Sequence, residues 1–148
     1  MKYIHHIYIT VFVKQDEKEN IILEELKKFL PENIEKEKIS IKEETATIND
    51  FETMKILRSK LSKDKHTKQF ISIIKEKLSE KDLKKLVEEK NRVDEEGNFY
   101  FRLSKKKLVD EKLFELTDSG DCFHFKIQIA AYPKSRKNAL EIVKKIFE

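Results

Sequence analysis

Three segments of the chain alternate between apolar and polar side chains, and a period of two residues predicts β-strands with one buried face. These segments are residues 3–13, 99–103 and 123–129. In the first, Ile7, Ile9 and Val11 fall on one side and Tyr8 and Thr10 on the other. Three less regular segments also favour strands, because they contain β-branched and aromatic residues: 39–47, 54–61 and 113–117.

Apolar residues recur at helical spacing between these segments. The expected helices cover residues 16–30, 64–78, 79–87 and 135–146, with a single helical turn at 104–109. Asp16 with Glu19 has the spacing of a capping box, and Ser79 with Asp82 has the spacing of a second one. His66, in the first turn of the second helix, is expected to face solvent.

The order of elements, β-α-β-β-α-α-β-β-β-α, is typical of an α+β fold. Because hairpin-like connections dominate, we expect a mostly antiparallel sheet with helices packed on one face and the other face open to water. The 148 residues suit one domain, spanning 1–148. The expected core contains Ile9, Val11, Leu26, Leu57, Phe70, Ile74, Phe101, Phe125, Ile127, Ile142 and Val143.

Several classes of protein are disfavoured. The single Cys122 allows no internal disulfide and favours a reducing compartment, here the cytoplasm. No segment approaches the roughly 20 apolar residues of a membrane span, and no cleavable leader is expected. With Gly97 and Gly120 as the only glycines, a glycine-rich phosphate loop is excluded. We expect no cofactor and no metal.

One cluster has residue types suited to catalysis. Asp118, Asp121 and His124 surround a turn, and carboxylates beside an imidazole are typical of acid–base or metal chemistry. Aspartate is also favoured in turns because its side chain bonds to the backbone. We favour this structural interpretation and expect no enzyme.

The net charge of +4 lies entirely in the last third, where residues 99–148 contain 11 Lys and Arg against 7 Asp and Glu. The basic residues form two clusters, with Lys126 between them in a strand. The clusters are Arg102, Lys105, Lys106 and Lys107, and then Lys134, Arg136 and Lys137. From charge alone, phosphate binding and the solvated surface of a Lys-rich chain remain equally open.

Four stretches together resemble an archaeal family of small proteins described as predicted RNA-binding proteins, some of them as predicted exosome-associated subunits. The stretches are residues 3–7 (YIHHI), 94–103 (DEEGNFYFRL), 116–121 (LTDSGD) and 126–133 (KIQIAAYP). Ser119 stands where the family turn has glycine, a departure that bears on the turn type. The resemblance implies a fold like that of the fifth large-subunit ribosomal protein, with an antiparallel sheet backed by helices.

We therefore expect a non-catalytic protein that binds structured or double-stranded RNA and reads shape and phosphate more than sequence. The seven basic residues of the two clusters, together with Lys126, are candidate phosphate contacts, and Tyr100 or Tyr132 is a candidate for stacking on a base. An RNA-processing complex is an expected partner, and the resemblance implies that this complex is the exosome. The alternative is an assembly module that forms a homodimer or joins a complex through the open sheet face, where exposed tyrosines such as Tyr8 suit a protein interface.

Overall fold

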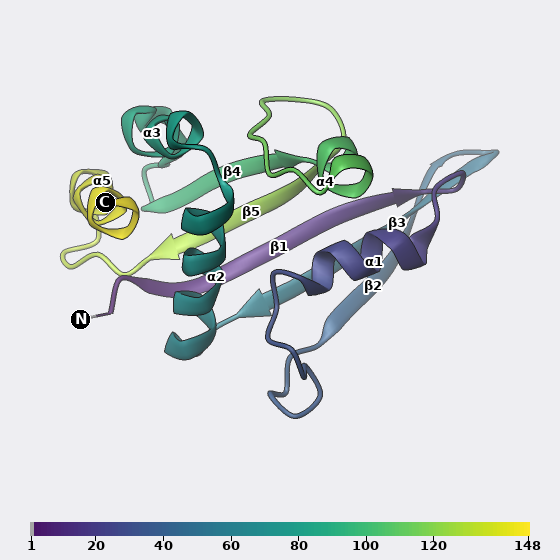
Figure 1. Ribbon diagram of the computed structural model, residues 1–148, viewed down its shortest axis with the longest axis horizontal. Helices are drawn as coiled ribbons and strands as arrows, with labels where there is room; N and C mark the ends of the chain where they lie inside the picture. The colour runs from purple at the N-terminus through teal and green to yellow at the C-terminus, as the bar shows by residue number, and fades with distance from the viewer. Residues whose placement is uncertain (1) are drawn as a thin grey trace.

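The computed structural model describes residues 2–148, which form a five-stranded sheet with five α-helices (Figure 1). The strands are β1 (Ile4–Lys14), β2 (Ile41–Asn49), β3 (Glu52–Leu61), β4 (Asn98–Ser104) and β5 (Cys122–Ile129). They lie in the order β2-β3-β1-β5-β4, and each neighbouring pair is antiparallel. The predicted α+β class with an antiparallel sheet is confirmed.

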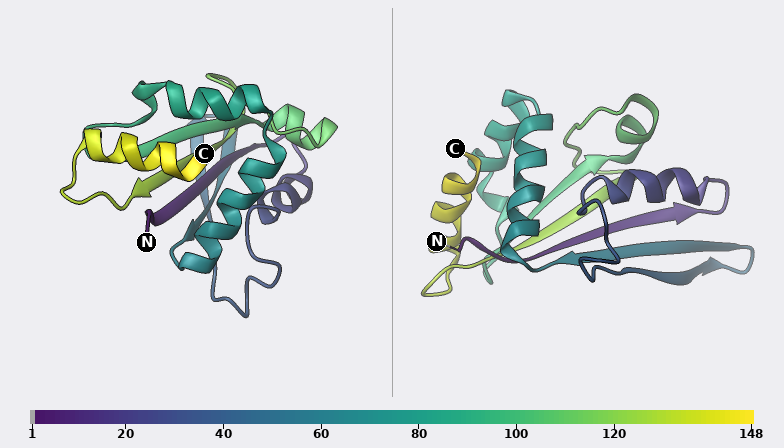
Figure 2. Two further views of the ribbon diagram at one scale, coloured as in Figure 1. Left: turned by 60° about the vertical axis from the view of Figure 1, so that its left-hand side comes forward. Right: turned by 60° about the horizontal axis from the view of Figure 1, so that its bottom comes forward.

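The helices cover one face of this sheet, as the right-hand view of Figure 2 shows. They are α1 (Glu19–Lys27), α2 (Asp64–Lys77), α3 (Glu80–Glu88), α4 (Lys105–Glu111) and α5 (Arg136–Phe147), with a short 3-10 turn, η1 (Lys90–Arg92), after α3. Within residues 2–148, no helix is both long and apolar enough to cross a membrane. Among the residues that the structure describes, no helix covers the opposite face of the sheet.

Aromatic rings form the centre of the core between the sheet and the helices. The ring of Phe125 on β5 lies 4.7 Å from that of Phe101, 5.0 Å from that of Phe29 and 5.5 Å from that of Phe70. Tilted and offset pairs of this kind are favourable arrangements for aromatic side chains. The predicted core residues are buried except Ile142, which is half-buried and packs against the cluster.

The observed helix starts confirm one of the two predicted N-terminal caps and contradict the other. Ser79 accepts a hydrogen bond from the Asp82 amide at 3.1 Å and caps α3 as predicted. The predicted cap at Asp16 is wrong, because α1 begins later, at Glu19, and has no side-chain cap. The capping-box spacing there lies in a turn instead, which Glu17 closes by accepting from the Lys14 amide at 2.9 Å.

The strand expected at residues 113–117 is also wrong. This segment makes one isolated bridge, Leu103 with Leu116, and no ladder. The amide of Leu116 donates to the Asp82 carboxylate of α3 at 3.1 Å, so that part of the segment is bonded to a helix. The segment runs beside the end of β4, where the Ser104 amide donates to the Glu115 carbonyl and the Thr117 amide to the Arg102 carbonyl. It is an irregular connection to the turn at Gly120, whose positive φ of 83° is as expected.

Candidate nucleic-acid interface

A row of alternating cationic and aromatic side chains crosses the uncovered face of the sheet. Tyr8 of β1 is paired with Lys60 of β3 on one side and with Lys126 of β5 on the other. Lys126 is paired in turn with Tyr100 of β4. Because paired residues on adjacent strands point to the same face, the four side chains form one row across four strands.

A second row runs beside the first, two residues further along each strand and so roughly 6–7 Å away. It contains Lys42, Arg58, Thr10, His124 and Arg102, each opposite the next across the sheet. Neither row contains an acidic residue. We call the nine residues of the two rows the basic face.

Contacts with neighbouring side chains orient the tyrosines of the basic face. The Nζ atoms of Lys60 and Lys126 lie 5.6 Å and 5.5 Å from the centre of the Tyr8 ring, within the range of cation–π attraction. The hydroxyl of Tyr100 donates to the Asp94 carboxylate at 3.0 Å. Burial raises the pKa of Tyr100, and this hydrogen bond raises it further. Both rings are half-buried, with the polar edge of Tyr100 fixed.

His124 is the one titratable group of the basic face whose charge changes near neutral pH. Burial lowers its pKa, and the nearby charges of Arg102 and Lys126 lower it further. The imidazole is therefore neutral at pH 7, where it offers one hydrogen-bond donor and one acceptor.

Of the first predicted basic cluster, only Arg102 lies on the basic face, together with Lys126. Lys105 is 3% exposed, and its Nζ donates to the Phe12 carbonyl and to Glu17 Oε1, both at 2.8 Å. It therefore acts as an internal tie between α4, β1 and the turn before α1. Lys106 is exposed, and Lys107 pairs with Glu111 at 3.2 Å.

In the second predicted cluster, Lys134 and Lys137 are exposed, whereas Arg136 is bound to the protein itself. Its Nε donates to the Val93 carbonyl at 2.9 Å and its Nη2 to the Lys90 carbonyl at 2.7 Å. Arg136 thus fixes η1 against the start of α5, and its planar fork is already occupied in the free protein.

The two predicted clusters lie at opposite ends of the β4–β5 pair, where Figure 1 shows α4 and α5 far apart. Ser104, which precedes α4, is paired with Cys122, and Asn98 is paired with Gln128 near the end that leads to α5. The two pairs lie six residue steps apart along the strands, or about 20 Å. The clusters therefore do not form one patch.

The residues suspected of catalysis are divided between two places. Asp118 and His124 line one open cavity, together with Arg102 and Tyr100. Asp121 lines another and pairs with Lys14 at 2.5 Å, which lowers the pKa of its carboxyl group. Among residues 2–148, no group of three His, Cys, Asp or Glu side chains is placed to hold a metal ion.

Sequence reasoning missed most of the basic face. Lys42, Arg58, Lys60 and Tyr8 were not among the predicted contacts, because their neighbours depend on the register of β3 against β1 and β2. A usable signal existed in the strand at 54–61, where Arg58 and Lys60 alternate with buried Leu57 and Leu61. Cations at alternate positions of a strand share one face.

A family model described as RNA binding matches residues 6–129, most of the chain from β1 to the last residue of β5. The chain belongs to this RNA-binding family. The matched range contains β1 from His6 onward and the whole of the other four strands, and therefore every residue of the basic face. No curated protein matches the chain.

Solved structures of archaeal proteins share the fold of this member of the RNA-binding family. Mth689, a DUF54 protein from Methanothermobacter thermautotrophicus, is 28% identical, with a TM-score of 0.80 over 99% of this chain and 100% of that one. AF2318 from Archaeglobus fulgidus is 22% identical, with a TM-score of 0.80 over 97% and 99%. A UPF0201 protein from Methanococcus jannaschii, 14% identical, has a TM-score of 0.63 over 97% and 99%.

Proposed function

We propose that this protein binds RNA through the basic face and catalyses no reaction on it. The observation that carries the proposal is the row Lys60, Tyr8, Lys126 and Tyr100, in which cations and aromatic rings alternate across four strands. Membership of a family described as RNA binding supports it. Such a surface offers a phosphate contact and a stacking contact at each step along a nucleotide chain.

The cations and the aromatic rings of the two rows make different contacts with RNA. Lys42, Lys60 and Lys126 neutralise phosphates as point charges. Arg58 and Arg102 bind phosphate with two parallel hydrogen bonds once Arg58 leaves its ion pair with Glu44 and Arg102 leaves the Asp118 carbonyl. Tyr8 and Tyr100 stack on unpaired bases, the mode by which sheet surfaces recognise RNA. The preferred RNA is therefore a structured one with an unpaired segment on the basic face, whose flanking duplex is recognised by shape and 2′-hydroxyls.

The test is a titration of duplex, hairpin and single-stranded RNA at several salt concentrations. Each neutralised phosphate contributes about −0.7 to −0.9 to the slope of log K against log salt. Lys60→Glu with Lys126→Glu removes two contacts, and the slope should become shallower by about 1.4 to 1.8. The matched control, Lys134→Glu with Lys137→Glu, makes the same change of charge at the start of α5.

Two results would contradict the proposal. One is wild-type binding no tighter than the weak end of the nonspecific range, about 10⁻⁴ M at physiological salt. The other is equal loss of affinity in the two double variants, which would mean that net charge and not the basic face determines binding. Loss confined to the α5 pair would move the interface to the second predicted cluster.

A second function, protein assembly, is favoured by the tip of the β2–β3 hairpin. Phe51 is 91% exposed and Ile48 50% exposed there, beside the free edge of β2. A homodimer, or a subunit contact in an RNA-processing complex such as the exosome, would bury these side chains. Sedimentation of wild type and Phe51→Ser distinguishes the outcomes, since only an interface at the tip makes the association state depend on Phe51.

A further inference from the structure

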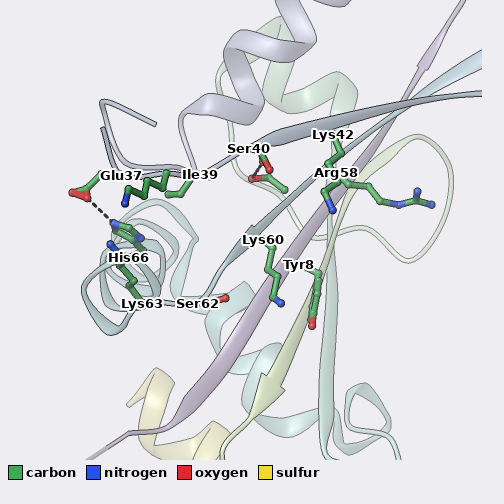
Figure 3. A pocket seen from close by; sticks show the side chains of 12 residues that line it. Tyr8, Glu37, Ile39, Ser40, Lys42, Arg58, Lys60, Ser62, Lys63 and His66 are labelled. Carbon is green, nitrogen blue, oxygen red and sulfur yellow. Dashed lines mark hydrogen bonds and ion pairs between the residues drawn. The ribbon is translucent and has the colours of Figure 1, made fainter. Parts of the chain in front are cut away.

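An open cavity of ≈ 500 Å³ lies at the β2–β3 end of the basic face (Figure 3). The connection before β2, residues 33–40, and the start of α2 form its outer wall. Four of its lining residues belong to the basic face: Tyr8, Lys42, Arg58 and Lys60. The cavity is therefore continuous with the proposed RNA surface. Its volume is that of a site for one small molecule or one nucleotide.

The outer wall contains a buried imidazole without a hydrogen-bond partner. His66 was predicted to face solvent, which is wrong: it is 3% exposed, because residues 33–40 fold over the first turn of α2. Its Nε2 makes no hydrogen bond within residues 2–148 and lies 3.6 Å from Glu37 Oε2, too far for one. Buried polar atoms almost always have a partner, so this edge of the imidazole has a bonding capacity that Glu37 leaves unfilled.

The local backbone fixes Glu37 beside His66. Asn33 accepts from the Lys36 amide at 3.1 Å, and the Ile39 amide donates to the Ile34 carbonyl at 2.9 Å. Between them Lys38 adopts a left-handed φ of 59°, which reverses the chain directly after Glu37.

The two oxygens of the Glu37 carboxylate differ, because a lysine outside the cavity lining binds Oε1. Lys65 Nζ donates to Oε1 at 2.8 Å, and this bond lowers the pKa of Glu37. The carboxylate is therefore ionised at neutral pH. Its Oε2 is left beside His66 as an available acceptor.

Glu37 is the one carboxylate among the residues that line the cavity. Figure 3 shows it with His66 and Lys63 on one side, and Lys60, Arg58 and Lys42 on the other. An ionised carboxylate repels phosphate and accepts hydrogen bonds from hydroxyl groups. Protein carboxylates bind ribose hydroxyls in this way. The cations opposite attract phosphate. A ligand that matches both sides carries hydroxyls at one end and a phosphate at the other, as one ribonucleotide does.

We propose that this cavity binds the 3′-terminal nucleotide of an RNA chain, with its 2′- and 3′-hydroxyls on Glu37 and His66 and its phosphate on Lys60 and Arg58. The inference rests on the proposed function, since the rest of the RNA continues over the basic face. An internal nucleotide has a phosphate on its 3′ side, which would meet the Glu37 carboxylate and the closed wall of residues 33–40. The 3′-terminal nucleotide has both hydroxyls free, and no further nucleotide has to leave the cavity beyond it.

The experiment measures fluorescence anisotropy of one 5′-labelled single-stranded RNA with three different ends. The ends are a free cis-diol, a 3′-phosphate and a terminal 2′,3′-dideoxynucleotide. The diol should bind about tenfold more tightly than either of the others, the factor that corresponds to one hydrogen bond to a charged group. Glu37→Gln should reduce this preference to within about twofold, because a neutral amide neither repels the 3′-phosphate nor binds the diol as strongly.

The matched control is Glu35→Gln, which makes the same change of charge at an exposed position of the same connection, outside the cavity. It should leave the preference for the diol unchanged. His66→Gln is a second variant; it should weaken the diol RNA and leave the 3′-phosphate RNA unaffected, which a general loss of folding would not do.

The outcomes separate this inference from the proposed function. Equal affinity for the three ends, with loss of all binding in Lys60→Glu with Lys126→Glu, would overturn the 3′-end site and leave RNA binding by the basic face intact. Absence of binding to any RNA would overturn both. If adenosine 5′-monophosphate bound as tightly as the diol RNA, the 3′-end site would also be overturned, because the cavity would then be a site for free nucleotides.

Discussion

Strand β5 buries every second side chain beneath the helices, whereas β2, at the far edge of the same sheet, has no fully buried residue. β5 and its neighbour β4 are held by aromatic packing around Phe125 and Phe101. β2 is held mainly by its ladder to β3, from Ile41 to Asn49. The difference indicates that β2 and the hairpin tip add little to the core, to which β3 contributes Leu57 and Leu61. This outer part of the hairpin is free to carry surface chemistry.

The hairpin extends past α1 in Figure 2, and its outer part has no helical cover. Its surface pairs are ionic, such as Lys55 with Glu19 at 3.1 Å and with Glu43 at 2.8 Å. Exposed pairs of this kind contribute little to stability. The cavity proposed for the RNA end lies where this hairpin meets the packed half, so it has one rigid wall on α2 and one on a strand pair held mostly by backbone hydrogen bonds.

The largest expected effect is the loss of stability when the packed half of the sheet, formed by β1, β5 and β4, is disrupted. Phe125→Ala should lower the free energy of unfolding by about 3–5 kcal/mol, because the ring is fully buried and contacts three others. Ile48→Ala, at the exposed hairpin tip, should change it by less than about 0.5 kcal/mol. Denaturant unfolding of both variants measures the contrast. Similar losses in the two would mean that the hairpin is as much a part of the core as β5.

A smaller effect is expected at Lys105, which ties α4 to β1. Lys105→Ala removes hydrogen bonds to the Phe12 carbonyl and to Glu17, and should cost about 2–3 kcal/mol, the range for bonds to a charged group. Glu17 is partly exposed, so water limits the loss. RNA affinity of the folded variant should match wild type. A phosphate-binding role for Lys105 predicts the reverse: little change in unfolding and a shallower salt dependence of RNA binding.

The comparison of the two ends also shows what the sequence could predict. Alternation identified β1, β4 and β5, because a strand under helices must bury every second residue. It identified the hairpin strands less sharply, since β2 buries nothing completely and its apolar pattern is weak. The false strand at 113–117 had apolar residues but is bonded to Asp82 of α3, a contact between distant segments.

The candidate site was harder to predict than the fold. Charge along the chain grouped Lys105 with Arg102, but α4 turns Lys105 inward while Arg102 lies on the open face. The same charge count overlooked Lys60 and Arg58, which lie in a segment of zero net charge. Their significance depends on register, which places them beside Tyr8 and Thr10. Local sequence does not determine register between strands that are more than 40 residues apart.

The smallest expected effect concerns pH and would sharpen the distinction between stability and binding on the basic face. The pKa of His124 lies below its ordinary value of 6.5 in the folded protein, because of burial and of the charges on Arg102 and Lys126. The unfolded chain therefore binds more protons just below pH 6.5, and stability falls as the pH falls from 6.5 through the folded pKa. His124→Gln should remove this part of the decline. Burial and Lys60 also lower the pKa of His6, so a remainder should persist.

RNA binding should have the opposite dependence on pH. A phosphate beside Arg102 and Lys126 offsets their charge and raises the pKa of His124 in the complex, so the complex takes up a proton as the pH falls. Affinity should then increase from pH 7.5 to pH 5.5 in wild type and stay flatter in His124→Gln, whereas His5→Gln, at an exposed site outside the two rows, should behave as wild type. Anisotropy titrations at constant ionic strength measure this. Two results would contradict this prediction: stability and affinity that change with pH in the same direction, or a His124→Gln variant that alters neither. Either would mean that no phosphate lies against this histidine, and that the RNA avoids the β5 and β4 part of the basic face.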